Sequence, residues 1–324
     1  MKHQMYTCKN MFFSNKTSNT YDVLDGFKTT INNWGDVFLK KKVFLIGAGG
    51  KMGLVISQRL KSTDEYDSFF CEVSEEGINK LRSIGISQIA DIDTSVPEAD
   101  IVILGIPDKL IGKLSGVIIP KMKTGAMIIG LDPGAAYAGV MPIREDIAYF
   151  VVHPHHPYLF NTETDENGNL DLFMGTAHQD CSCAVYKAPE GTEDIYYEEG
   201  EKISRIIWAP VGKTFRITVE QMGMCEPGLV ESIGAPMIYA LKQAYDRFVE
   251  MGVPEDALFS FLMGHLRVQI AIYFKMIPQT VSDGANLALE MAMKDLFKDD
   301  WLNKMTSKKY IYKNVCDITD ATNK

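Results

Sequence analysis

The chain has 324 residues, a length that predicts about two domains. Hydrophobic residues make up 46% of it and charged residues 23%, proportions that are typical of a globular protein. The net charge of −9 argues against non-specific binding to nucleic acid or to an anionic membrane surface. No apolar run reaches the roughly 20 residues that cross a bilayer, so we expect no membrane span.

Residues 1–40 are rich in Asn, Thr and Lys and carry no motif, so we interpret them as an N-terminal extension. They lack the apolar core of a secretory signal. The six cysteines include a Cys181-x-Cys183 pair that is too isolated for a four-cysteine zinc site. Free thiols in a reducing compartment are the simplest interpretation, and we expect a cytoplasmic protein.

The stretch VFLIGAGGKMG, Val43–Gly53, predicts a turn that binds a dinucleotide. Val43–Ile46 suits a buried strand, and the apolar residues after the turn recur at helical spacing. Glycines let the backbone approach a pyrophosphate closely, and the helix N-terminus offers free N–H groups to it. The last glycine falls one place later than in the usual G-x-G-x-x-G motif. The predicted cofactor-binding residues of this turn are Gly47, Gly49, Gly50, Lys51, Met52 and Gly53.

An acid follows this turn at the distance that the fold requires. The next predicted strand is Phe69–Val73, and Glu72 within it lies 19 residues after Gly53. A carboxylate there accepts hydrogen bonds from the adenosine ribose and repels a 2′-phosphate, so we expect NAD rather than NADP. The alternative is a structural glycine turn with Glu72 as a solvated charge at the end of its strand.

Strands alternate with helices up to about Val219, which predicts an α/β Rossmann domain with a parallel, doubly wound sheet over residues 41–219. The strongest strand, 99–106, ends in Pro107 and Asp108, which we expect to border the nicotinamide. The segment 161–172 is polar and predicts a surface loop. Further strands are expected near Ile89 and at 126–131, 148–152, 183–187 and 214–219, and helices at 75–83, 109–118 and 192–208.

The sequence His153-Pro154-His155-His156-Pro157 follows a predicted strand at the expected cofactor crevice. In an extended segment the side chains of His153 and His155 point to one side and that of His156 points elsewhere. A neutral imidazole is a general base for an alcohol proton or a ligand of a divalent metal. The alternative is a set of histidines that only hydrogen-bond to loop carbonyls.

After Val219 the periodicity becomes helical, which predicts an all-α C-terminal domain over residues 220–324. Expected helices cover 229–251, with a kink or break at Pro236, then 255–274 and 283–296. The second of them is apolar on most sides, so it is expected to be buried in the domain core or at a subunit interface.

The segment MCEPGLVE, Met224–Glu231, places two carboxylates where the chain leaves the nucleotide-binding domain. Glu226 precedes Pro227, which suits a helix start, and Glu231 lies one turn later. One carboxylate with one or two histidines makes an open site for zinc or another divalent ion. An acid at a helix start also has a purely structural explanation, because it complements the helix dipole.

Five segments together resemble the D-apionate oxidoisomerase group of NAD-dependent enzymes, within the 6-phosphogluconate-dehydrogenase-like superfamily: IGAGGKMG, HPHHPYLF, TVEQMGMCEPGLVES, FLMGHLRVQIAIYF and SDGAN. The resemblance covers roughly residues 41–301. It implies oxidation of a branched sugar acid by NAD, coupled to a rearrangement of the carbon skeleton, and a homodimer formed through the helical domain. It also implies that His153 and Glu226 bind a divalent metal, with Glu231 as the alternative carboxylate. His155 and His156 are then the candidates for proton transfer.

Two other interpretations stay open. A β-hydroxyacid dehydrogenase or reductase without metal would use a helix-borne lysine as its base, and Lys242 is the candidate, although it lies far along its helix. A redox sensor would bind NAD without turnover.

Overall fold

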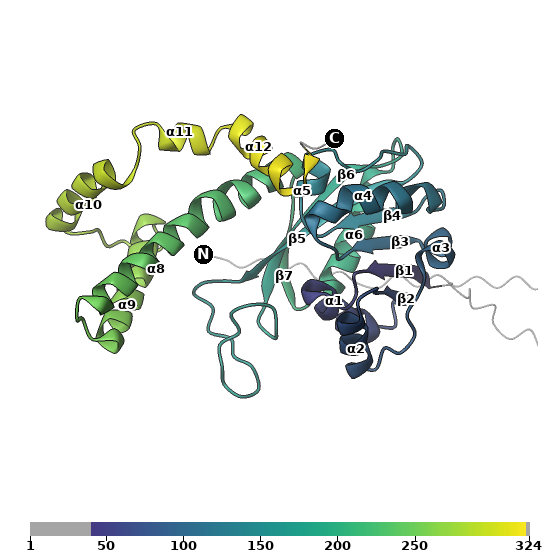
Figure 1. Cartoon of the computed structure of the whole chain (residues 1–324), viewed down its shortest axis with the longest axis horizontal. Coiled ribbons are helices and arrows are strands. Elements are labelled where there is room, and N and C mark those ends of the chain that lie inside the picture. The colour runs from purple at the N-terminus through teal and green to yellow at the C-terminus, as the bar shows by residue number, and fades with distance from the viewer. Residues whose placement is uncertain (1–39, 322–324) are drawn as a thin grey trace, which may run out of the picture. The chain divides into compact units, whose positions relative to one another are not determined.

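Seven strands form one sheet, in the order β2-β1-β3-β4-β5-β6-β7 (Figure 1). The computed structural model describes residues 40–321, so almost all of the expected N-terminal extension lies outside the described residues. The strands are β1 (Lys41–Ile46), β2 (Tyr66–Cys71), β3 (Ile101–Leu104), β4 (Met127–Gly130), β5 (Ala148–Pro157), β6 (Gln179–Lys187) and β7 (Val211–Arg216).

The sheet is mixed rather than parallel throughout. All neighbouring strands from β2 to β5 run parallel, as do β6 and β7, whereas β5 and β6 are antiparallel. The predicted α/β doubly wound fold is confirmed, and its sheet is parallel except at the β5–β6 pair. An irregular loop joins β5 to β6, and without a crossover helix the chain returns beside the strand that it has just left.

Helices cover both faces of the sheet, as a Rossmann fold requires. Side chains alternate along β1, so that Val43 and Leu45 join one hydrophobic core while Phe44 and Ile46 join the other. The first core packs under α1 (Lys51–Lys61), α2 (Glu75–Ser83) and α6 (Glu193–Ile207). The second packs under α4 (Asp108–Ile118), α5 (Gly134–Tyr137) and α7 (Val219–Gly223). The short elements between them are α3 (Ile92–Ser95), η1 (Val96–Glu98) and η2 (Ile119–Lys121).

The expected strand near Ile89 is not formed. The segment 86–90 has no regular secondary structure, and its backbone hydrogen bond to the sheet runs from Ala90 N–H to Phe70 O (2.8 Å). One hydrogen bond does not make a strand ladder. In contrast, β5 is longer than predicted, and it carries the whole His-Pro-His-His-Pro segment within the sheet.

The C-terminal part is helical, as predicted. α8 leads away from the sheet, and α11 and α12 return towards it (Figure 1). The helices are α8 (Ala235–Glu250), α9 (Glu255–Tyr273), α10 (Asp283–Leu296), α11 (Trp301–Met305) and α12 (Lys308–Ile318). Nothing in the structure tests the expected domain boundary near Val219, which stays a prediction.

The backbone has a kink before α8. The chain winds as a wide π-helical segment, η3 (Met224–Gly234), in which Glu226 leaves the helical region with φ −143° and ψ 120°. Pro236 lies in the first turn of α8, which continues directly from η3. The kink that the backbone angles show is at Glu226, and the predicted kink or break at Pro236 stays a prediction.

The predicted core position of the apolar helix is also wrong for the single chain. Along α9 Ala271 is the sole buried residue, whereas Phe259 and Phe261 are more than half exposed. The alternative, a subunit interface, stays a prediction. Among the helices of residues 40–321, none has the length and apolar character needed to cross a membrane.

Candidate active site

Close backbone packing requires glycine at two positions of the turn between β1 and α1. Gly47 has φ +77°, and a Cβ on it would lie 2.3 Å from Gly105 O of the neighbouring strand end. A Cβ on Gly53 would lie 2.0 Å from Gly47 O, so the first turn of α1 packs directly onto the loop. Gly50 caps α1 and leaves its first N–H groups open. Gly53 comes one place later than in the usual motif, but it still allows the close helix–strand packing that such turns need.

Glu72 is tied to this turn. Its carboxylate accepts hydrogen bonds from Gly49 N–H (2.9 Å), Val73 N–H (2.8 Å), Ser74 N–H (2.8 Å) and the Ser74 hydroxyl (3.0 Å). Burial alone would raise the pKa of Glu72, but these four donors outweigh it and lower the pKa. The predicted contact with a ribose is not tested, and Glu72 in this structure holds the turn in shape.

Two adjoining pockets form a crevice along the carboxyl edge of the sheet. The first, of about 420 Å³, lies between the glycine turn and Glu72, and the second, of about 350 Å³, extends from Lys51 to His153. They share Gly50 and the segment 105–107. This edge is where parallel α/β sheets bind nucleotides. The residues that line the second pocket and had been predicted as site residues are Gly50, Lys51, Met52, Pro107, Asp108 and His153.

The structure brings His153 and Glu226 together. Nε2 of His153 lies 2.6 Å from Oε2 of Glu226, and its Nδ1 donates a hydrogen bond of 3.2 Å to Leu131 O. Burial would lower the pKa of His153, but the hydrogen bond and charge of Glu226 raise it. Burial would likewise raise the pKa of Glu226, and the bond to His153 lowers it. The pair therefore favours an imidazolium facing a carboxylate.

Further carboxylates surround this pair. Burial, together with the charges of Asp108 and Glu226, raises the pKa of Asp132 to about 7. Burial also raises the pKa of Asp108, and burial followed by the charge of Glu226 raises that of Glu231. The alternative carboxylate Glu231 thus lies in the same electrostatic environment, but the hydrogen bond of His153 is made by Glu226.

His155 and His156 point to different surroundings. Nε2 of His155 lies 2.7 Å from the Ser182 hydroxyl, and its ring stacks on Phe215 of β7 with centroids 5.7 Å apart. Burial, and then the charge of His153, lower the pKa of His155, which favours the neutral form. His156 has φ +61° and stacks on Phe173 of the loop after β5, with centroids 5.1 Å apart.

The predicted metal site has two donor side chains, His153 and Glu226. Within residues 40–321 no group of three or more His, Cys, Asp or Glu side chains is arranged to hold a metal ion. His153 and Glu226 offer one imidazole nitrogen and one carboxylate oxygen at a single place. That donor set fits two positions of a divalent ion, which would take the place of the shared proton.

Sequence reasoning missed Asp132. Its oxygen Oδ1 accepts the Gly134 N–H (2.7 Å), and Oδ2 lies 3.8 Å from Nδ1 of His153. The available signal was its position directly after the strand now seen as β4, between the strands that deliver Asp108 and His153. Carboxyl ends of neighbouring parallel strands meet at one edge, so an acid there belongs to the site.

The Rossmann fold, the glycine crevice and the histidine–carboxylate cluster define a dinucleotide-dependent oxidoreductase. Residues 161–319 match the family described as phosphogluconate dehydrogenase (decarboxylating) C-term. The chain is 41% identical over 262 residues to the D-apionate oxidoisomerase of Rhizobium rhizogenes, covering 81% of this chain and 94% of the relative. It is 38% identical to that of Cupriavidus necator, covering 87% of this chain and all of the relative. The chain belongs to the D-apionate oxidoisomerase family and is an NAD-dependent oxidoreductase.

A solved structure shares the fold over most of the chain. It is a semialdehyde dehydrogenase NAD-binding protein from Cupriavidus necator in complex with calcium and NAD, 37% identical with a TM-score of 0.81. The alignment covers 87% of this chain and 100% of that one. A ketol-acid reductoisomerase from an uncultured archaeon, at 17% identity and a TM-score of 0.61, shares the fold alone.

Proposed function

We propose that this enzyme oxidises a sugar-derived hydroxy acid with NAD and couples the oxidation to an isomerisation, as the name D-apionate oxidoisomerase states for its relatives. The observation that carries the proposal is the His153–Glu226 pair, 2.6 Å apart, at the end of a crevice that begins at the glycine turn. Membership in a family of enzymes argues against the alternative of a sensor that binds NAD without turnover.

The glycine crevice is proposed to hold NAD, which supplies the hydride acceptor. The free N–H groups at the start of α1 would donate to the diphosphate. Within residues 40–321, Oε2 of Glu72 accepts only the Gly49 N–H and would also accept a ribose hydroxyl, and Pro107 and Asp108 would border the nicotinamide. The calcium and NAD complex of the Cupriavidus necator protein supports this placement by likeness only.

His153 and Glu226 are proposed to hold a divalent ion, with substrate oxygens as the remaining ligands. Such an ion supplies a Lewis acid that polarises a ketone. An imidazole in the donor set suits zinc or manganese, whereas calcium prefers oxygen ligands. Adding each ion to the chelator-treated enzyme would identify the metal.

The chain's own groups complete the reaction. Asp108 and Asp132 line the pocket, and their open oxygens can accept hydrogen bonds from substrate hydroxyls. His155 lies beside the Ser182 hydroxyl, and burial lowers its pKa and favours a neutral imidazole that can accept the hydroxyl proton, with His156 as the second candidate. Both roles remain predictions.

The test is NADH formation from NAD and D-apionate, before and after treatment with a chelator. Turnover that the chelator abolishes, and that zinc, manganese or calcium restores, supports both the reaction and the metal site. Turnover that survives complete removal of metal would leave the oxidoreductase without a metal. Absence of turnover with NAD still bound would refute D-apionate as the substrate.

The metal-free dehydrogenase remains the second candidate, because two protein ligands make an incomplete metal site. Its candidate base Lys242 is engaged elsewhere. The ammonium forms an ion pair of 2.5 Å with Asp246, one turn further along the exposed face of α8. A dehydrogenase without metal would therefore need a different base, such as His155.

We also propose a homodimer formed through α8 and α9. The support is the exposure of large apolar side chains, among them Ile238, Tyr239, Phe259 and Phe261, on helices that bury little against their own chain. A second copy would offer the same surface in return, as a two-fold interface requires. A cytoplasmic location and the lack of nucleic-acid partners stay predictions from composition.

A further inference from the structure

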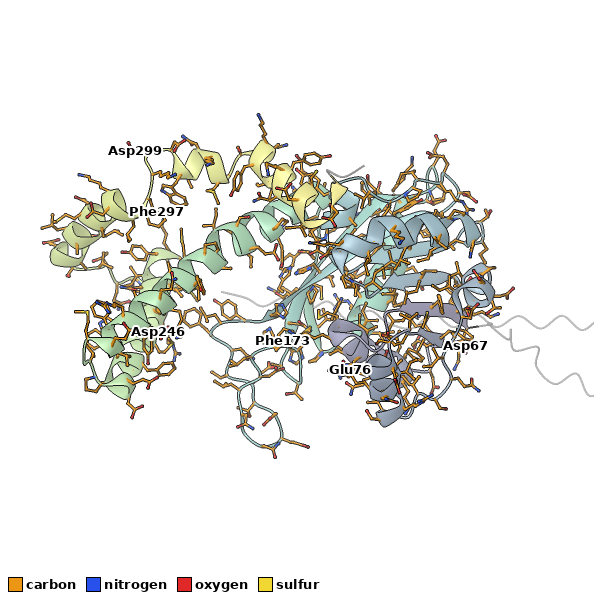
Figure 2. The ribbon with its side chains drawn as sticks, in the orientation of Figure 1. Asp67, Glu76, Phe173, Asp246, Phe297 and Asp299 are labelled. Atoms are coloured by element: carbon orange, nitrogen blue, oxygen red, sulfur yellow. The ribbon has the colours of Figure 1, made fainter. Side chains whose placement is uncertain are left out.

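The loop between β5 and β6, residues 158–178, presents an aromatic ring to the active site. Phe173 lies on this loop near α1 (Figure 2). The residue is 41% exposed, so burial in the core does not explain its place. Its ring instead contacts two polar side chains, His156 of β5 and Lys51, and Lys51 lines the second pocket of the crevice.

The first of these side chains is His156. The two rings stack with centroids 5.1 Å apart and an angle of 22° between their planes, and Nδ1 of His156 donates a hydrogen bond of 3.2 Å to Phe173 O. His156 has φ +61°, a left-handed conformation that costs about 1–2 kcal/mol in a residue with a Cβ. Such a conformation persists where its surroundings fix it, and the Phe173 ring and carbonyl are those surroundings.

The second side chain is Lys51, the first residue of α1. Its Nζ lies 4.4 Å from the centroid of the Phe173 ring, within the range of a cation–π contact. Lys51 lines the same pocket as Asp132 and His153. In the described part of the chain the Lys51 ammonium group forms no salt bridge, and its contact is with the Phe173 ring, which orients it.

The loop is built to hold the ring in this place. The Asp171 carboxylate accepts hydrogen bonds from the backbone N–H groups of Phe173 (3.0 Å), Gly175 (2.7 Å) and Ala177 (2.9 Å). Arg59 of α1 then donates a hydrogen bond of 2.7 Å to Gly175 O. The turn that carries Phe173 is therefore fastened both within itself and to the helix that starts at the cofactor crevice.

We propose that Phe173 is a positioning residue of the active site, whose ring holds the His156 imidazole for proton transfer and the Lys51 ammonium for an anionic group of a ligand. The anion is either the substrate carboxylate or the cofactor diphosphate, because both reach this pocket in the proposed function. The inference rests on that function, since it assigns a purpose to His156.

The test compares Phe173→Leu with Phe173→Trp. Leucine keeps the apolar bulk but has no aromatic face, whereas tryptophan keeps the face for both stacking and the cation. We expect Phe173→Leu to lower kcat/KM for the acid about 3- to 30-fold, the range that one lost cation–π or stacking contact gives, and Phe173→Trp to stay within about 2-fold of the original protein. Leu172→Ala is the control, because this neighbouring side chain is 81% exposed, and it should leave activity unchanged.

The arms of the experiment identify the anion. A rise in the Kd for NADH, measured by fluorescence titration without substrate, assigns Lys51 to the diphosphate. A rise confined to the KM for the acid assigns it to the substrate carboxylate. A Phe173→Leu variant with unchanged kcat, KM and Kd refutes the positioning role. An unmodified enzyme without turnover on any hydroxy acid instead refutes the proposed function, and the purpose assigned to His156 with it.

Discussion

Single residues decide the chemistry here, and the His153–Glu226 pair is the clearest case. The two side chains are 18% and 23% exposed and share one short hydrogen bond. Each would be a poorly solvated group without the other. The pair is therefore expected to contribute to stability as well as to activity.

Replacing Glu226 by glutamine tests this. We expect Glu226→Gln to destabilise the protein by about 1.5–3 kcal/mol, the range for a hydrogen bond to a charged group, and to reduce turnover at least 100-fold. Glu231→Gln is the matched control, because His153 is bonded to the other carboxylate, and it should cost far less in both respects. Chemical denaturation and NADH formation measure the two effects. A larger loss from Glu231→Gln would assign the site to that carboxylate instead.

A second residue-scale prediction concerns Asp146. The hydrogen bond and charge of Arg144, with a further bond from Thr124, lower the pKa of Asp146 to about 2. A carboxyl whose pKa is depressed in the folded protein stabilises it above the unfolded value near 4, and this contribution disappears as the pH falls to 2. Asp146→Asn should therefore lower the urea midpoint at pH 6, and the difference should shrink between pH 4 and pH 2. A difference that is constant with pH would exclude the ion pair as its cause.

At the scale of elements, local sequence patterns were enough to predict most strands and helices. The apolar runs in β1, β3 and β4 and the helical spacing of α9 and α10 predicted those elements because each is set by neighbouring residues. The reversal of β6 and the break at Glu226 were not predictable in this way. Both depend on where the chain meets distant segments, such as the sheet edge and His153.

The same limit applies to the site. The glycine turn and the histidine segment are contiguous in sequence and could be predicted, and the pairing of His153 with Glu226 followed from a resemblance. Asp132 and Phe173 were missed, because a lone acid after a strand and a phenylalanine in a polar loop have no local signature. Their significance comes from neighbours 17 or more residues away in the chain.

Two glycines in helices give a matched prediction at this scale. A methyl group on Gly53 of α1 would lie 2.0 Å from Gly47 O, whereas one on Gly116 of α4 would meet nothing within 4 Å. Gly53→Ala should displace the turn, abolish NADH binding and destabilise the fold. Gly116→Ala should stabilise the protein by about 0.5–1 kcal/mol, because alanine lowers the entropy of the unfolded chain. NADH titration and thermal melts measure both, and normal NADH binding by Gly53→Ala would contradict the role of the turn.

At the scale of the whole molecule, the C-terminal helices pack little against the rest of the described chain. No residue of α8 or α10 is buried. Apolar helices are stable in water when their apolar faces are covered, since helix propensity alone does not hold them. A second copy of the chain is the proposed cover, and its effect can be measured.

Ile238→Asp on α8 should convert the dimer to a monomer, because a buried carboxylate without a partner costs several kcal/mol in an interface. Ile238 is 62% exposed in the single chain. Ile195 on α6 is the matched control, since it is 66% exposed but lies on the nucleotide-binding domain. Light scattering after size-exclusion chromatography should give one chain mass for Ile238→Asp and two for Ile195→Asp and the original protein. If all three run as monomers, the helices are not covered by a second copy, and if all three run as dimers, the interface lies elsewhere than around Ile238.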